Sequence, residues 1–103
     1  MAQEAANFDA TLAAAAGEDP ALLAELRAAF AQSLEQQVDL LRRARCDGNW
    51  IVAAQRLKGL GASFHAPELV RLAELALEGA PGEPGVIRKL AALCDRFAFP
   101  QGE

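Results

Sequence analysis

The sequence is poor in the residues that build metal and disulfide sites. It has two cysteines, one histidine and no tyrosine among 103 residues. Cys46 and Cys94 lie far apart and neither belongs to a C-x-x-C pair, so a closed zinc site is almost excluded. We expect both cysteines to be small, buried apolar residues in a reducing compartment. We therefore expect neither a metal nor a cofactor.

Long apolar runs and broad basic regions are also missing. No run of about eighteen apolar residues is present, which argues against a membrane span. The opening MAQEAANFDA lacks the basic start and apolar stretch of a signal peptide, so we expect a cytoplasmic protein. The net charge is −4, and the best basic group is Arg42, Arg43 and Arg45. Three cations in the last turn of a helix usually complement the helix dipole and are solvated. Because nucleic-acid binders normally have a broad basic face, we expect no nucleic-acid binding.

The abundant residues favour helices. Ala, Leu, Glu and Arg are frequent, β-branched residues are few, and no stretch alternates with a period of two residues. The length fits one domain, residues 1–103, with its core at about residues 20–98. The sequence therefore predicts an all-α fold, an antiparallel four-helix bundle with a short extra N-terminal helix.

Turn and capping residues set the expected helix limits. Asp19 and Pro20 in GEDPALL indicate a helix start, and the prolines and glycines of EGAPGEPG, residues 78–85, indicate a loop. Asn7 or Asp9 is the expected cap of the first helix and Gly17 its end, while Asn49 is expected to cap the third. The expected helices run from about Asp9 to Ala16, Pro20 to Cys46, Trp50 to Phe64, Pro67 to the loop, and Val86 to Phe97.

Apolar residues spaced by three and four positions predict which faces are buried. The expected core positions are Leu23, Leu26, Phe30, Leu34, Val38, Leu41 and Ala44, then Leu69, Leu72, Ala73 and Ala76, and finally Ile87, Leu90, Cys94 and Phe97.

The expected third helix has two unlike faces. At 100° per residue, a buried stripe lies within about 60° of Leu57 and includes Gly61, which would let a neighbouring helix approach closely. Gln55 falls about 160° from Leu57, on the outer face. Gly59 lies beside it, although glycine in an exposed helix costs about 1 kcal/mol relative to alanine. Something other than helix stability should therefore favour Gly59.

The stretch AQRLKGLGASFHA resembles the motif of histidine-containing phosphotransfer (HPt) domains, in which A-H-x-L-K-G is followed six residues later by glycine and then alanine. The matching residues are Ala54, Leu57, Lys58, Gly59 and Ala66. The resemblance covers roughly residues 8 to 98, including DGNW before the motif and PELVRLAELALE after it. It implies a four-helix bundle that relays phosphoryl groups between receiver-domain aspartates, with the lysine and its following glycine beside the phosphoryl group.

Two residues depart from that pattern. Gln55 stands at the phosphoacceptor position, and a carboxamide nitrogen is not basic and cannot accept phosphate as an imidazole does. His65 stands at the position where the family has glycine. It lies about 15 Å further along the helix axis than Gln55 and about 80° around it. A histidine at the C-terminus of a helix more often caps the helix or interacts with its dipole. The contact face for a receiver domain is then expected to contain Ile51, Gln55, Arg56, Lys58, Gly59 and Ala62.

We therefore expect a non-enzymatic, HPt-like module that binds receiver domains of response regulators or hybrid kinases without carrying phosphate. Two alternatives remain. One is an active phosphotransfer protein that uses His65 as its acceptor. The other is a helical-bundle adaptor with an unrelated role.

Overall fold

The computed structural model describes residues 10–98, which are helical apart from their turns and contain no strand. The helices are α2 (Pro20–Arg43), α3 (Asp47–Ser63), α4 (Pro67–Glu78) and α5 (Pro84–Ala98). A helical segment at residues 10–15 precedes them. The predicted all-α class is confirmed.

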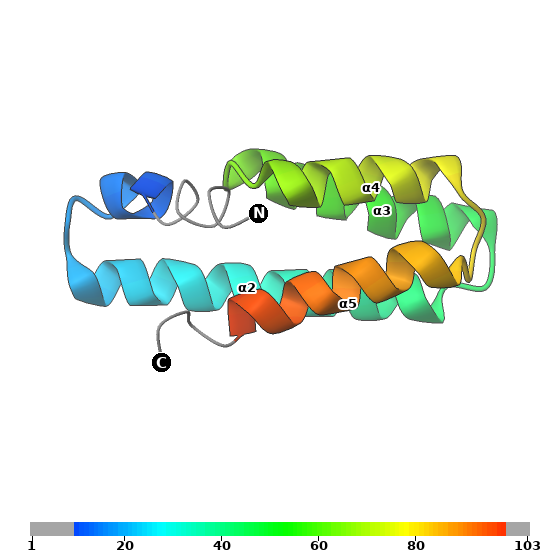
Figure 1. Cartoon of the computed structure of the whole chain (residues 1–103), viewed down its shortest axis with the longest axis horizontal. Coiled ribbons are helices and arrows are strands. Elements are labelled where there is room, and N and C mark those ends of the chain that lie inside the picture. Colours follow the sequence, from blue (N-terminus) through cyan, green and yellow to red (C-terminus); the bar gives the residue numbers. More distant parts are fainter. Residues whose placement is uncertain (1–9, 99–103) are drawn as a thin grey trace.

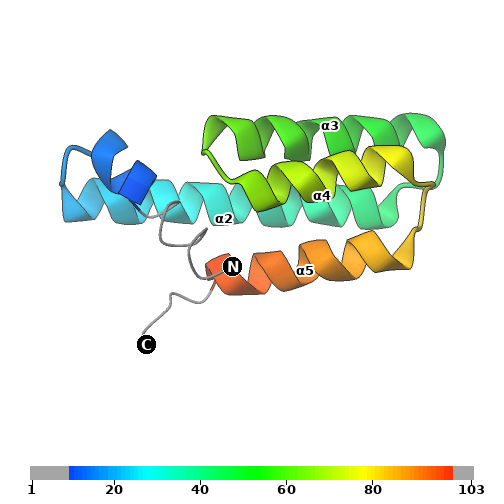
Figure 2. The same ribbon diagram turned by 45° about the horizontal axis from the view of Figure 1, so that its top comes forward.

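The helices run alternately in opposite directions (Figure 1). Helix α2 packs against α3 and α5, α3 packs against α4, and α4 packs against α5. Figure 2 shows α2 as the longest element, with residues 10–15 beside its N-terminal half and α5 beside its C-terminal half. This arrangement leaves one side of each helix exposed to solvent, and for α3 that side carries Gln55.

The starts of α2 and α5 follow from their prolines. Asp19 accepts hydrogen bonds from the backbone N–H groups of Ala21 and Leu22, at 3.0 and 3.4 Å, as predicted for an N-cap. Helix α5 begins at Pro84 rather than at the predicted Val86, because proline is well suited to the first helical position, where no N–H donor is needed.

The turn between α2 and α3 differs from the prediction. Helix α2 ends at Arg43 rather than Cys46, since Ala44 has an extended backbone with ψ of 132°. Helix α3 begins at Asp47, so Asn49 lies inside its first turn and the prediction that Asn49 is the cap was wrong. An acidic residue in the first turn is favourable to the helix dipole, which supports this earlier start. The predicted caps Asn7 and Asp9 lie outside the described residues.

The core contains the predicted stripes, with a few corrections. Leu23, Leu26, Ile87, Cys94 and Phe97 are only partly buried and pack against its edge. Cys46 is exposed, so its predicted burial was wrong, because α2 ends at Arg43 and Cys46 lies in the extended connection before α3. The buried residues that the prediction did not include are Leu12, Ala16, Ala66, Val86 and Leu93.

Specific contacts join neighbouring helices. The buried indole of Trp50 donates a hydrogen bond to the Ala76 carbonyl at 2.7 Å, which ties the start of α3 to the end of α4. At the opposite end of the bundle the Phe30 ring lies 5.0 Å from that of Phe64 and 4.9 Å from that of Phe97. These contacts fix how α3 lies between α2 and α4, and so which of its residues face outward.

Candidate functional site

The outer face of α3 is uncharged along its centre. Gln55, Gly59 and Ala62 are exposed there, as the helical periodicity predicted. Ile51 lies one turn before Gln55 and is 41% exposed. Within the part of the chain that the structure describes, the Gln55 amide forms no side-chain hydrogen bond, so its donors and acceptor are available to a partner.

One apolar member of this face was not predicted. Val52 is 46% exposed, the largest exposed fraction among the large apolar residues of the described chain. At 100° per residue it lies about 60° from Gln55, on the side away from Ile51. Helical periodicity alone therefore places Val52 on the outer face. The prediction missed it because Val52 had not been assigned to either face. Ile51 and Val52 therefore form an exposed apolar pair before Gln55.

The two glycines of α3 have opposite surroundings. A methyl group added at Gly59 would meet no atom within 4 Å, so the backbone there is open to a partner. At Gly61 the same methyl group would lie 2.9 Å from Val70 Cγ2 and 3.0 Å from the Val70 backbone nitrogen. The prediction that Gly61 permits close approach of a neighbouring helix is confirmed, and that helix is α4.

Lys58 does not extend freely into solvent. Its ammonium group lies 3.3 Å from a carboxylate oxygen of Glu74 on α4, with both side chains about half exposed. The exposure limits such a pair to about 0–1 kcal/mol. A second acidic residue of α4 also pairs with a neighbouring helix: a carboxylate oxygen of Glu68 lies 2.6 Å from the guanidinium group of Arg96 on α5.

Arg56 lies at the edge of the face. It is exposed, and within residues 10–98 it forms no ion pair. The structure therefore places all six predicted contact residues on the exposed side of one helix, with the charged ones at its margins.

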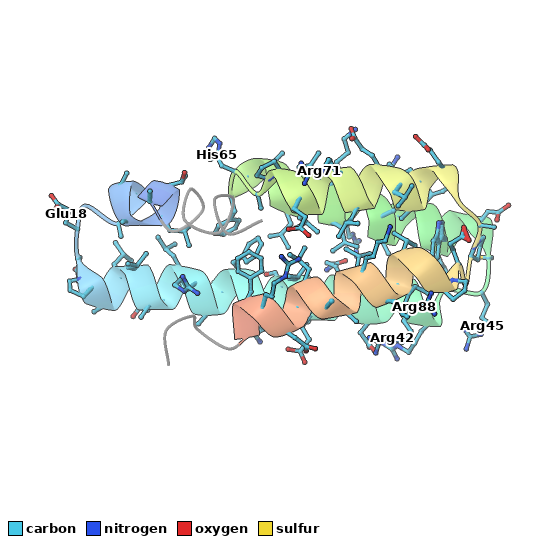
Figure 3. The ribbon with its side chains drawn as sticks, viewed as in Figure 1. Glu18, Arg42, Arg45, His65, Arg71 and Arg88 are labelled. Atoms are coloured by element: carbon cyan, nitrogen blue, oxygen red, sulfur yellow. The ribbon has the colours of Figure 1, made fainter. Side chains whose placement is uncertain are left out.

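His65 lies past the end of α3 and in a left-handed backbone conformation, with φ of 56°. Its N–H donates to the Ala62 carbonyl at 3.3 Å, and the N–H of Ala66 donates to the Gly61 carbonyl at 2.8 Å. This pair of bonds is the Schellman motif, whose left-handed position usually holds glycine. His65 therefore ends the helix through its backbone, while its exposed side chain points away from the bundle (Figure 3).

Replacing His65 by glycine should stabilise the protein. A left-handed conformation costs a residue with a side chain about 1–2 kcal/mol, and part of this gain is lost to the greater freedom of glycine in the unfolded chain. We expect His65→Gly to raise the free energy of unfolding by about 0.5–1 kcal/mol in urea titrations. Ser63→Gly, two residues earlier and still helical, is the control and should lower it by about 0.5 kcal/mol. A loss of stability in both variants would contradict this account of the helix end.

Two further observations concern metal ligands and the Cys94 thiol. Residues 10–98 contain no group of three His, Cys, Asp or Glu side chains placed to hold a metal ion. Burial, with added repulsion from the carboxylates of Glu35 and Asp95, raises the pKa of the Cys94 thiol to about 11. Cys94 is therefore a neutral thiol at physiological pH and a poor nucleophile.

Comparison with known proteins adds no relative: no family model, curated protein or solved structure matches the chain. None of the helices in the described range combines the length and apolar character needed to cross a bilayer. The functional assignment therefore depends on the geometry of α3 and on the resemblance of its motif.

Proposed function

We propose that this protein is an HPt-like module that binds receiver domains and does not itself carry phosphate. The observation that supports this most is the position of Gln55. It lies at the centre of an exposed, uncharged face of α3, where the resembling family places its phosphoacceptor histidine. A docking face with an amide in place of the acceptor still binds the receiver domain but has no nucleophile to accept the phosphoryl group.

The surroundings of Gln55 support docking of another protein. Ile51 and Val52 offer exposed apolar surface, and Gly59 leaves the backbone open one turn later. Apolar residues at the centre and charges at the rim are typical of protein interfaces. Lys58 and Arg56 are the rim charges here. Such a module would inhibit a response regulator, compete with an active relay protein, or hold a receiver as a scaffold.

A charge introduced on this face should strongly weaken receiver binding. We expect Ala62→Glu to weaken binding at least tenfold, because a carboxylate would be desolvated at the interface without a partner. The measurement is calorimetry or interferometry with a receiver domain selected from those of the same cell. Ala92→Glu is the matched control, since Ala92 is an exposed residue of α5 and the substitution adds the same charge.

The two variants separate the proposal from an unrelated adaptor role. Equal weakening by both variants would point to overall charge rather than to the α3 face. Failure of every receiver domain of the cell to bind the wild-type protein would refute the proposed function outright.

A further inference from the structure

Arginines gather where α2 ends and α5 begins. Arg42 and Arg43 form the last turn of α2, and Arg45 lies in the connection to α3. Arg88, more than forty positions later, lies in the second turn of α5. Figure 3 shows Arg42, Arg45 and Arg88 at this same end of the molecule.

The packing of α2 on α5 explains why Arg88 joins the other three. Arg42 lines a groove between these helices together with Ala91 and Asp95 of α5. Arg88 precedes Ala91 by three residues and therefore lies on the same face of α5. Because α2 and α5 are antiparallel (Figure 1), the step from Ala91 back to Arg88 leads towards the end of α2. The fold thus adds a fourth arginine to a group of three.

Within residues 10–98, two of the four arginines share one carboxylate, and the other two have none within 4 Å. Asp39 lies 2.9 Å from Arg43 and 3.9 Å from Arg42. In the described chain Arg45 and Arg88 have no carboxylate within 4 Å, although Asp47 and Glu83 lie nearby in sequence. The Arg45 guanidinium donates only a long bond, 3.4 Å, to the Arg42 carbonyl. Two guanidinium groups therefore keep their donors free for an external anion.

Helix electrostatics do not account for the whole cluster. Arg42 and Arg43 are favoured by the negative end of the α2 dipole. Arg88 lies in the second turn of α5, beyond the first turn in which the dipole acts, so the dipole does not account for it. The chain as a whole has a net charge of −4, so the cluster does not follow from a generally basic composition.

We propose that Arg42, Arg43, Arg45 and Arg88 bind an acidic segment of a partner protein. The planar fork of arginine matches a carboxylate with two parallel hydrogen bonds. Four arginines on a protein of net charge −4 form a small patch, whereas nucleic-acid binders normally have a broad basic face. The site uses none of the predicted contact residues of α3, so it is independent of the receiver-binding proposal.

Binding of a fluorescent hexaglutamate peptide tests this site. At low ionic strength, about 20 mM, the peptide should bind the full-length chain, and its affinity should fall as salt is added. Each free arginine contributes up to several-fold in affinity. We therefore expect Arg45→Gln/Arg88→Gln to weaken binding about tenfold.

Lys89→Gln is the control, because Lys89 is exposed beside Arg88 but lies about 100° away around α5. It should change the affinity less than twofold, and circular dichroism should show all variants folded. Absence of peptide binding by the wild-type chain, or equal loss in the Lys89 variant, would overturn the proposal. So would tighter binding of a hexathymidylate oligonucleotide, which would assign the arginines to nucleic acid.

Discussion

Gln55→His should enable the protein to form an acid-labile phosphohistidine at position 55. The substitution supplies the nucleophilic nitrogen that a carboxamide lacks, at an exposed position with open backbone beside it. The measurement is incubation with a receiver domain whose aspartyl phosphate carries the radiolabel. Transfer breaks the aspartyl–phosphate bond, so the receiver should lose label and regain its free aspartate as the label appears on the histidine. The wild-type chain should stay unlabelled under the same conditions.

The remaining histidine provides the control for this gain. In Gln55→His/His65→Ala the label should persist, because His65 lies beyond the end of α3 and not on the outer face that contains Gln55. Label on the wild-type chain that disappears in His65→Ala would instead support an active phosphotransfer protein that uses His65. An unlabelled Gln55→His chain that still folds and binds the receiver would mean that other residues of the site have also changed.

The ion pair of Lys58 should reduce the gain without preventing it. Glu74 lies 3.3 Å from the lysine ammonium and competes with an incoming phosphoryl group for its charge. Because the pair is about half exposed, it contributes no more than about 1 kcal/mol. Adding Glu74→Gln to Gln55→His should therefore raise the amount of label at equilibrium by up to about fivefold.

Gly61→Ala and Gly59→Ala should change stability in opposite directions although the chemical change is the same. At Gly61 the new methyl group would lie 3.0 Å from the Val70 backbone nitrogen and 3.2 Å from the Ala66 carbonyl oxygen, so α3 and α4 must move apart. Overpacking of this kind costs about 1–3 kcal/mol. At Gly59 no atom lies within 4 Å, and alanine should add about 1 kcal/mol from helix propensity.

Urea unfolding of the two variants measures this difference directly. Each glycine is the other's control, since both lie inside α3 and gain the same methyl group. A stabilised Gly61→Ala variant would mean that the approach of α4 to α3 is less close than the structure shows. If Gly59→Ala is more stable but binds the receiver more weakly, the glycine is retained for docking rather than for folding.

Much of the helical architecture is local and could be read from the chain. Asp19 and Pro20 start α2 because a side-chain oxygen and a missing N–H are needed at a helix start wherever it lies. The exposure of Gln55 also follows from periodicity alone, since Trp50 and Leu57 mark the buried side of the same helix. The turn at residues 44–46 was less predictable, because several residues there can end one helix or begin the next.

The sequence by itself determined the all-α class, the buried stripes and the position of an uncharged amide, Gln55, on the outer face of α3, because each depends on residue identity and on spacing along one helix. Only the tertiary structure decided that Glu74 pairs with Lys58, that Val70 requires Gly61, and that Arg88 joins the arginines of α2. Each of these contacts joins two different helices. Its existence depends on how the helices are rotated and shifted against one another, which periodicity within a single helix does not specify.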